Sequence, residues 1–289
     1  MAFQISRRKF LGYGAAVVTC SAVAADTFFF APHHPVTEHI EIRLDRLPPS
    51  FNGFRIAQIS DIHFGPYMGK AGVERGVLLA QQFNPDLVVL TGDFVSHPFG
   101  KPNGPEGARH AEPVAEIFHR WQGVPIVGIL GNHDHWNDPK IVAGALRSGG
   151  IRVLLNESYA IEREQDRLWI AGLDDAFENK ADLIKAIASV PKTEATIVLV
   201  HEPDVADNIA RAPVDLQLSG HSHGGQVQIP GVGPIVLPYL GKKYPIGLYR
   251  IGQMQLYTSR GLGVINPPVR FDCPPEVTLI TLRASRALA

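Results

Sequence analysis

The sequence predicts an α/β protein, and two observations carry that prediction. Short continuous apolar runs, among them Leu87–Leu90 and Thr196–Val200, are typical of strands that are covered on both faces. Between these runs lie segments of helical length whose ends are marked by proline or glycine. With 289 residues, of which 45% are apolar, the chain can bury a full core. No internal repeat or linker interrupts residues 39–283, so we expect one domain there.

Each element is placed by its local pattern. Residues 39–44 alternate between polar and apolar, as a half-buried strand does. A helix over 71–83 is stopped by Pro85, and residues 96–108, rich in proline and glycine, are expected to form a loop. Beyond residue 225 the helical pattern disappears, and short apolar stretches predict strands and hairpins. The remaining predicted elements are strands at 54–60, 87–90, 125–130, 168–172, 196–200 and 215–219, and helices at 112–120, 138–148 and 180–189.

Composition excludes several classes of protein. Lys plus Arg is 27 and Asp plus Glu is 28, so the chain lacks the basic excess of a nucleic-acid-binding protein, and no nucleic acid partner is expected. No uncharged apolar run reaches the length of a spanning helix, which argues against a polytopic membrane protein. Two cysteines, Cys20 and Cys273, are too few for a disulfide scaffold. The 12 histidines stand out, because histidine is the commonest metal ligand.

Residues 1–25 predict an export signal. The stretch Ser6–Leu11 places two adjacent arginines ahead of Leu11–Ala25, which is uncharged and only mildly hydrophobic, and Ala22–Ala24 fits a small-x-small cleavage site. This pattern resembles a twin-arginine (Tat) signal, which implies the Tat translocase as a partner and the periplasm or cell envelope as the destination. Two alternatives stay open: an uncleaved leader kept as an anchor, and a basic N-terminus before an ordinary buried helix.

Residues 26–38 are interpreted as a linker between this leader and a domain at 39–289. The linker contains Phe28–Phe30, a small apolar cluster that packs on the domain or touches a membrane surface. We expect packing, and keep peripheral membrane contact as the alternative.

Polar side chains of metal-ligand type stand at the ends of five predicted strands. Since sites in open α/β sheets gather at the carboxyl ends of strands, folding is expected to bring these side chains together. Seven oxygen and nitrogen ligands are too many for one metal with an open position and suit two. With no thiolate among them, the set favours Mn²⁺, Fe or Zn²⁺. The seven are Asp61, His63, Asp93, Asn132, His201, His221 and His223.

In order, the chain carries Asp-x-His at 61–63, Gly-Asp at 92–93, Gly-Asn-His-Asp at 131–134, a lone histidine at 201 and Gly-His-x-His at 220–223. This set resembles the calcineurin-like metallophosphoesterase family. The resemblance implies a four-layer α/β/β/α sandwich with two mixed sheets flanked by helices. The leader, Gly-His-Ser-His-Gly-Gly-Gln at 220–226, and the segments 259–263 and 274–276 look like the branch of exported bacterial phosphodiesterases.

The resemblance also implies a role for each residue. Asp93 would bridge two divalent metal ions. His133 would sit beside the ligands and donate a hydrogen bond or proton to the phosphoryl group or leaving oxygen, and Asp134 would orient His133. The first metal would be held by Asp61, His63, Asp93 and His223, and the second by Asp93, Asn132, His201 and His221.

The chemistry then follows from charge. Two cations about 4 Å apart neutralise phosphoryl oxygens and lower the pKa of a bridging water toward 7, so that the hydroxide attacks in line. Taken singly, each motif has an ordinary structural explanation: a helix cap, a turn or a satisfied polar residue. Five such coincidences in order are improbable, which favours the metal site.

Two residues and one segment are candidate substrate contacts. Arg260 could reach a phosphate with its planar guanidinium, and a structural salt bridge is the alternative. His135, with Trp136, could line the substrate cleft, or only pack. The segment Ile229–Tyr249 could form an apolar lip with a basic edge for a lipid-linked or cell-wall phosphodiester. Hairpins that complete the second sheet are the favoured alternative for that segment.

The expected function is therefore metal-dependent hydrolysis of a cell-envelope or lipid-linked phosphodiester. A UDP-2,3-diacylglucosamine-type pyrophosphatase is the first rival, although such nucleotides are cytoplasmic. A nuclease is weakened by the near-zero net charge. A non-catalytic periplasmic metal-binding protein is weakened by the intact His133 and Asp134, which metal binding alone does not need.

Overall fold

The computed structural model describes residues 7–96 and 104–285. The first six residues of the predicted leader, most of the first half of the predicted loop at 96–108, and the last four residues lie outside this range. Helices in the described part are α1 (Arg7–Ala25), α2 (Lys70–Gln82), α3 (Gly104–Ala108), α4 (Ala111–His119), α5 (Asn132–Asn137), α6 (Pro139–Ser148), α7 (Leu183–Ala186) and α8 (Ala206–Ile209). Shorter 3₁₀ turns lie at Pro49–Phe51, Pro203–Val205 and His223–Gly225.

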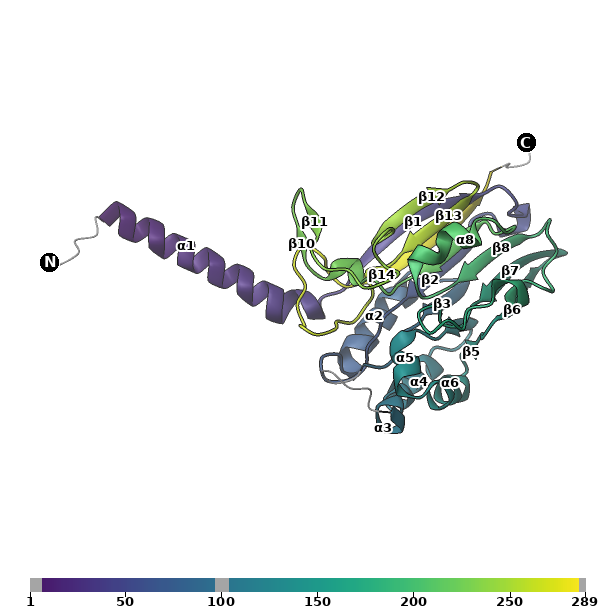
Figure 1. Ribbon diagram of the computed structural model, residues 1–289, viewed down its shortest axis with the longest axis horizontal. Helices are drawn as coiled ribbons and strands as arrows, with labels where there is room; N and C mark the ends of the chain where they lie inside the picture. The colour runs from purple at the N-terminus through teal and green to yellow at the C-terminus, as the bar shows by residue number, and fades with distance from the viewer. Residues whose placement is uncertain (1–6, 97–103, 286–289) are drawn as a thin grey trace.

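The strands form two large sheets and one small hairpin within the described residues (Figure 1). They are β1 (Val36–Leu44), β2 (Arg55–Ile59), β3 (Leu87–Thr91), β4 (Ile126–Ile129), β5 (Arg152–Val153), β6 (Glu157–Arg163), β7 (Asp166–Gly172), β8 (Ala195–Leu199), β9 (Leu216–Ser219), β10 (Gln228–Ile229), β11 (Gly233–Pro234), β12 (Gly247–Ile251), β13 (Met254–Thr258) and β14 (Glu276–Ala284).

The first sheet has the strand order β1-β14-β2-β3-β4-β5. Strands β2 to β5 are parallel, with Ile56 paired to Leu87 and Val88 to Ile126. The last strand of the chain, β14, is inserted between β1 and β2, parallel to the first and antiparallel to the second. The sheet is therefore mixed, and its parallel centre directs the ends of β2, β3 and β4 to one edge.

The second sheet has the order β12-β13-β9-β8-β7-β6. Its centre is parallel from β13 through β9 and β8 to β7, and the outer strands β12 and β6 are antiparallel to their neighbours. This sheet is also mixed, and it brings the ends of β8 and β9 to the same region as those of the first sheet.

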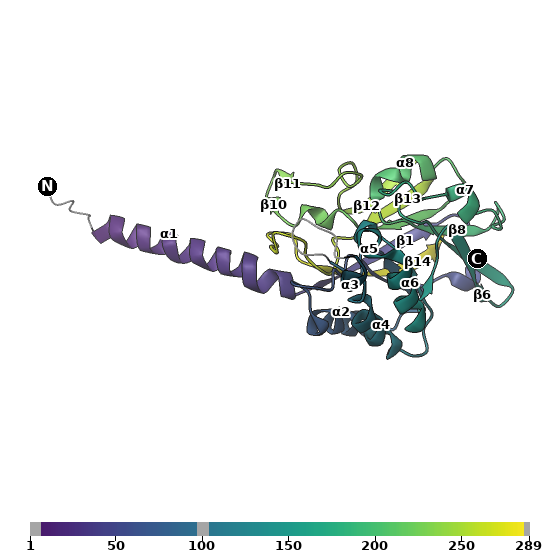
Figure 2. The ribbon, with the colours of Figure 1, turned by 60° about the horizontal axis from the view of Figure 1, so that its bottom comes forward.

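Three apolar cores show how the layers stack. One core lies between the sheets and includes Ile56, Val89 and Ile197. A second packs the first sheet against helices and includes Val77 of α2 and Leu146 of α6. Figure 2 shows α2 and α4 below the strands. A third covers the outer face of the second sheet and includes Ile209 of α8. The predicted α/β fold, with two mixed sheets flanked by helices, is confirmed.

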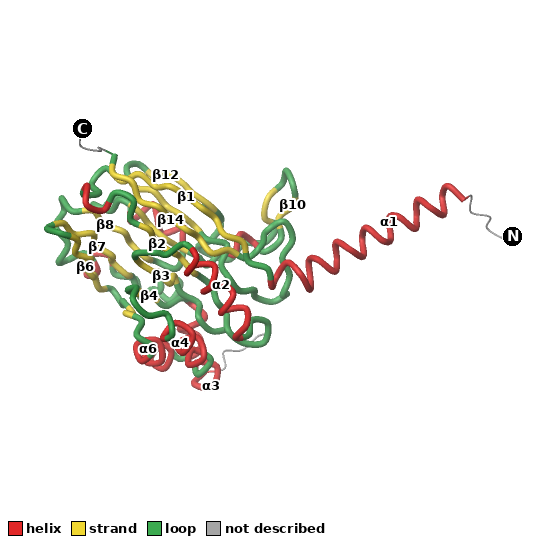
Figure 3. The backbone as a smooth tube through the Cα atoms, turned by 180° about the vertical axis from the view of Figure 1, so that it is seen from behind, coloured by secondary structure: helices red, strands yellow, loops and turns green. Residues whose placement is uncertain are grey.

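The segment expected to be a linker is structured differently. Helix α1 continues through a π-helical turn at Asp26–Phe30 and a 3₁₀ turn at Ala31–His33, and β1 already begins at Val36. Figure 3 shows α1 projecting away from the domain. Contrary to the expected packing, Phe28, Phe29 and Phe30 are 52%, 78% and 55% exposed.

The helical extension also lengthens the apolar segment. In the described part of the chain, Ala16–His33 is long and apolar enough to cross a membrane, and 6% of it is buried. The sequence-based estimate stopped the apolar run at Ala25, because Asp26 is charged. A membrane-spanning helix can contain one charged residue, so counting only uncharged residues underestimates the length of the apolar segment.

Three other expectations differ in detail. The predicted helix at 180–189 is reduced to the four residues of α7, in which Ile184 is 83% exposed, so little apolar burial holds a longer helix together. The predicted loop at 96–108 contains the short α3. The hairpin β10–β11 pairs with itself and does not join the second sheet, which β12 and β13 complete instead.

Candidate metal centre

All seven predicted ligands lie at the carboxyl ends of strands and meet at one place. Asp61 and His63 follow β2, Asp93 follows β3, and Asn132 follows β4 as the first residue of α5. From the second sheet, His201 follows β8, and the pair His221 and His223 follows β9. His221 is 6% exposed and the other six are 2% exposed or less. The structure therefore brings these strand ends together, as the sequence predicts.

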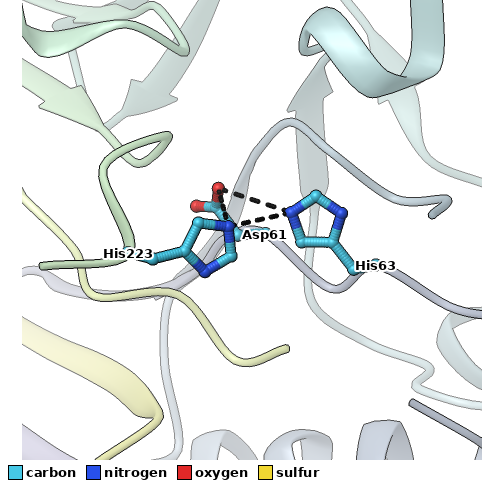
Figure 4. A group of neighbouring side chains, drawn as sticks. All are labelled: Asp61, His63 and His223. Carbon is cyan, nitrogen blue, oxygen red and sulfur yellow. Dashed lines mark hydrogen bonds and ion pairs between the residues drawn. The ribbon is translucent and has the colours of Figure 1, made fainter. Parts of the chain in front are cut away.

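One part of the cluster consists of Asp61, His63 and His223 (Figure 4). The Nε2 atoms of the two histidines are 2.9 Å apart. The Oδ1 atom of Asp61 lies 3.4 Å from Nε2 of His223 and 3.9 Å from Nε2 of His63. Three potential ligand atoms therefore surround one point, and a cation there would be close to each of them.

Asp93 connects this part of the cluster to the rest. Its Oδ2 atom lies 3.5 Å from Nε2 of His63 and 3.1 Å from Nε2 of His201. Burial favours the neutral carboxyl, but the positive charge of His201, then that of His133 and of His63, outweighs burial and holds the pKa of Asp93 well below its usual range. An ionised carboxylate between two histidines has the geometry expected of a bridging ligand.

The orientation of His221 tests whether the residues fit a metal. Its Nε2–H donates to the carbonyl of Tyr239 at 2.8 Å, so the lone pair of the neutral ring is on Nδ1. That Nδ1 faces Oδ1 of Asn132 at 3.0 Å. Burial, with the charge of His201, lowers the pKa of His221 to about 3, so the ring carries no second proton. Two acceptor atoms thus face each other, an arrangement that a metal ion satisfies.

His201 is fixed in the same manner. Its Nδ1–H donates to the carbonyl of Thr91 at 2.7 Å, which turns Nε2 toward Asp93. Burial disfavours a charged ring, but Asp93 and then Asp61 outweigh burial and raise the pKa of His201 well above its usual range. Its buried Nε2 has no hydrogen-bond partner among the described residues, so it is free to bind a divalent cation.

Backbone strain is concentrated in the same loops. Five of the seven predicted ligands have positive φ angles, in the left-handed region that few residues other than glycine adopt. They are Asp61 (50°), His63 (48°), Asp93 (57°), His221 (69°) and His223 (52°). Strain of this kind costs about 1–3 kcal/mol per residue and persists where a functional site requires it.

Two glycines allow the loops to approach each other. A Cβ on Gly220 would collide with Oγ of Ser60 and Oδ2 of Asp61. A Cβ on Gly131 would collide with Oδ1 of Asp93 and lie 2.8 Å from its backbone nitrogen. Each glycine precedes a predicted ligand, so the motif glycines are explained by close packing between ligand loops.

Asp134 binds the backbone of two loops. Its buried carboxylate accepts hydrogen bonds from the amides of Gly131 and Asp93 at 3.0 Å, of Phe94 at 2.9 Å and of Val95 at 3.2 Å. Burial, with the nearby charge of Asp93, raises its pKa to about 7. Asp134 thus holds the Gly-Asp loop against the Gly-Asn-His-Asp loop.

His133 lies at the edge of the cluster. Candidate ligand atoms of His63, Asp93 and His133 are within 4.8 Å of one another, and the His133 amide donates to Oδ1 of Asp93 at 2.9 Å. Its ring packs at 4.7 Å on Trp136, which contacts Phe177 at 5.6 Å. His133 is therefore close enough for a ligand as well as for an acid.

Phe177 was not singled out from the sequence. Besides Trp136 it contacts Tyr239 at 5.8 Å and His221 at 6.1 Å, so an aromatic wall follows His133 along the cluster. A lone aromatic in a loop gives no signal that it faces a site 44 residues away.

The two candidate substrate contacts are engaged elsewhere. Arg260 donates to Glu276 at 2.5 Å and pairs with Glu38, which is the structural alternative weighed from the sequence. His135 bonds Asp174 at 2.8 Å through Nε2 and Lys180 at 3.1 Å through Nδ1. Both ring nitrogens are occupied, so His135 joins α5 to the loop after β7 and does not face a substrate.

A different arginine, missed from the sequence, touches the cluster. Arg270 is fully buried, and burial lowers its pKa. Its guanidinium donates to the carbonyls of His223 at 3.0 Å, Arg260 at 2.9 Å and Gly263 at 2.5 Å. Arg270 thereby fixes the backbone that presents His223. An arginine that binds carbonyls has no sequence motif to reveal it.

The chain belongs to the calcineurin-like phosphoesterase family, whose model matches residues 54–225, the stretch that contains every predicted ligand. It is accordingly a metal-dependent phosphoester hydrolase, with the buried histidine and aspartate groups as candidate metal ligands.

Full-length relatives agree with this class. The chain is 33% identical to the uncharacterized metallophosphoesterase YkuE of Bacillus subtilis, over 98% of this chain and 99% of that protein. It is 30% identical to phosphodiesterase YaeI of Escherichia coli, over 96% and 99% of the two chains. Among solved structures, a dimetal phosphatase from Danio rerio aligns with a TM-score of 0.48 at 12% identity, covering 80% of this chain and 99% of that one.

Proposed function

We propose that this protein is a binuclear-metal phosphodiesterase that is exported by the Tat route and cleaves a cell-envelope or lipid-linked phosphodiester. The observation that carries the two-metal assignment is the position of Asp93. Its Oδ2 is shared between His63 and His201, which belong to different sheets. A single carboxylate between two sets of ligands is what two neighbouring cations require.

The ligand sets are those that the family resemblance implies, and the clustering of these side chains supports them. One metal would be held by Asp61, His63, His223 and Asp93, and the other by Asp93, Asn132, His201 and His221. Bound there, two divalent cations would neutralise the phosphoryl oxygens and supply an activated water. Ligands of this hardness, with no thiolate, suit Mn²⁺, Fe or Zn²⁺.

The protein's own residues would then position the reaction. Asp134 holds the two ligand loops together, Arg270 fixes the backbone at His223, and the ring of His133 lies beside Asp93 at the edge of the cluster. We assign His133 to the hydrogen bond or proton donated to the leaving oxygen.

Export is proposed from the first 25 residues. The Arg7-Arg8 pair, the uncharged run to Ala25 and the cleavage site at Ala22–Ala24 fit a Tat leader, and a periplasmic or cell-envelope location follows from it. The apolar helix at Ala16–His33 is compatible with retention as an anchor, so sequencing the N-terminus of the protein recovered from membranes distinguishes the two fates.

The deciding experiment uses the full chain, stripped of metal and refilled separately with Mn²⁺, Fe²⁺ or Zn²⁺. We expect two bound metals per chain and turnover of bis(p-nitrophenyl) phosphate well above that of p-nitrophenyl phosphate. Asp93→Asn should lose metal and turnover together. Preference for the monoester would contradict the phosphodiesterase assignment. Two bound metals with no turnover of any phosphoester would support the metal-binding rival instead.

A further inference from the structure

An apolar pocket of about 370 Å³ opens directly beside the candidate metal centre. Ser222 and His223 are among its lining residues, so one candidate ligand borders both the polar cluster and the pocket. The rest of the lining is largely aliphatic and includes Val227, Ile235, Leu237, Pro238, Ile265 and Val269. A substrate bound at the metals therefore has an apolar cavity next to it.

Most polar side chains in the lining are engaged, and the Oδ1 atom of the lining residue Asn266 accepts from the hydroxyl of Tyr67 at 3.3 Å. Gln226 accepts from the amide of Ile265 at 2.8 Å and donates to the carbonyl of Pro267 at 3.0 Å. The hydroxyl of Ser222 donates to the carbonyl of Pro245 at 2.5 Å. No lysine, arginine, aspartate or glutamate lines the pocket among the described residues. An alkyl chain suits such walls better than a nucleotide base or a sugar, for whose polar groups the lining offers few partners.

One wall of the pocket is joined to the N-terminal apolar helix. The amide of Arg270, next to the lining residue Val269, donates to the carbonyl of Thr27 at 3.0 Å. Thr27 lies inside the segment Ala16–His33 that could cross a membrane and is followed by the exposed Phe28–Phe30. Cleavage after Ala24 would leave both Thr27 and these phenylalanines in the chain.

The hairpin β10–β11 lies at the same end of the molecule as the inner end of α1 (Figures 1 and 3). The base of the hairpin is bonded to the chain just after the lining residue Val269, since the amide of Gln228 donates to the carbonyl of Phe271 at 2.9 Å. Val232 at its tip is 79% exposed, and Ile235 and Val236 at the pocket rim are 61% and 73% exposed. Exposed apolar side chains grouped in this way mark a contact surface.

From this arrangement we propose that the pocket binds an alkyl chain of a membrane-lipid phosphodiester whose phosphate lies at the metal centre. Phe28–Phe30 and the hairpin tip hold this end of the protein against the membrane. The proposal rests on the proposed function for its reaction, while the pocket's affinity for an alkyl chain stands apart from catalysis.

The test uses the full chain, refilled with Mn²⁺ and kept soluble by an amphipathic polymer. The substrates are p-nitrophenyl alkyl phosphodiesters with ethyl, butyl, hexyl and octyl chains, which share one leaving group. We expect kcat/KM to rise about two- to fourfold for each methylene that enters the pocket. Leu237→Trp fills the pocket and should abolish this rise, while turnover of the ethyl substrate stays within twofold of wild type.

Ile184→Trp is the matched control, because it adds the same ring at an exposed aliphatic position on α7, far from α1 (Figure 2). It should keep the full dependence on chain length. Should Leu237→Trp not fold, Ile235→Trp at the exposed rim serves in its place. A wild-type series that is flat, or a rise that survives in the filled variant, would overturn the proposal.

A binding measurement separates this proposal from the proposed function. A fluorescent long-chain fatty acid carries an alkyl chain without a phosphodiester and should bind the metal-stripped full chain and Ile184→Trp, but at least tenfold more weakly to Leu237→Trp. Absence of diester turnover with this binding intact would refute the enzyme assignment alone. Equal binding to all three proteins would refute the pocket assignment. A dimer lost in Leu237→Trp, with fatty-acid binding unchanged, would assign the pocket to a second copy of the chain.

Discussion

The polar cluster and the apolar pocket meet at His223 and are constructed in opposite ways. The cluster is formed by the ends of regular strands, its ligands are buried, and most of their φ angles are positive. The pocket is formed by the segments 222–227 and 235–238, which flank the β10–β11 hairpin, and by 265–269, and its rim is exposed. The comparison teaches that the sheets position the chemistry, whereas loops after the last ligand supply the surface that would select a substrate.

The largest expected effect comes from breaking the cluster while sparing the pocket. Gly220→Ala places a methyl group against Ser60 and Asp61, so Asp61 is displaced and one metal is lost. We expect turnover to fall by more than about 10³-fold, roughly 4 kcal/mol of barrier. Metal content and kcat for bis(p-nitrophenyl) phosphate check this.

Gly144→Ala is the control for that substitution. Its Cβ would have open space within α6, so we expect the free energy of unfolding to rise by about 0.5–1 kcal/mol and turnover to stay unchanged. Full turnover in Gly220→Ala would show that the close approach of these loops is not needed.

A smaller loss of activity is expected at His133, and it distinguishes a metal ligand from a general acid. His133→Asn should keep both metals and lower kcat by about 10²- to 10³-fold, because the leaving oxygen loses its donor. The effect should shrink with a leaving group that needs no protonation, such as p-nitrophenolate compared with an alkoxide. Loss of metal in His133→Asn would make His133 a ligand, which its distance from His63 and Asp93 also permits.

The two arginines near His223 provide a sharper test of where the cluster ends. Arg270→Met leaves three or more buried carbonyls without their donor and should lower the free energy of unfolding by about 3 kcal/mol. It should also weaken metal binding, since the His223 backbone is released.

Arg260→Met breaks a pair with the buried Glu276 and should lower the free energy of unfolding by about 2 kcal/mol, with KM for a small diester unchanged. A rise in KM alone would restore Arg260 as a substrate contact.

A still smaller change is expected where His135 of α5 contacts Asp174 in the loop after β7. Burial favours a neutral Asp174, but the hydrogen bond from His135 outweighs burial and lowers its pKa. A lowered carboxyl pKa contributes stability above the ordinary aspartate value of about 3.9, and that contribution is lost as the pH falls through the folded pKa. His135→Asn should therefore cost about 1 kcal/mol at pH 7 and less at pH 3. Denaturant unfolding of metal-free wild type and metal-free His135→Asn at both pH values measures this difference in the free energy of unfolding. A difference that does not depend on pH would contradict the role given to the hydrogen bond between His135 and Asp174.

The convergence of the seven ligands was predictable because each follows a recognisable strand, and parallel strands deliver their ends to one edge. Hydrogen bonds from side chains to backbone atoms were not predictable from the sequence. Asp134 looked like a partner of His133 and instead accepts four amide bonds, and Arg270 gave no signal at all. Such bonds depend on where two loops pass each other, which residue type and spacing do not record.

The prediction of a linker at 26–38 was wrong for a different reason. In the sequence the charged residue Asp26 ends the apolar run, but in the structure the helical turns continue past it to His33. Likewise Phe28–Phe30 were expected to pack on the domain and are exposed. The composition of a segment shows that it can be buried, and only the fold shows whether a surface is left to bury it.

The position of β14 between β1 and β2 has a consequence for how the chain matures. Glu41 and Arg283, paired across this region, are 242 residues apart, so the first strand waits for nearly the whole chain to be synthesised before it acquires its neighbour. Until then β2 presents an open edge to other chains, and pairing over such long sequence separation is slow. A protein assembled in this order is exposed to aggregation during its synthesis, and a message truncated before residue 276 would yield a chain that never closes its first sheet.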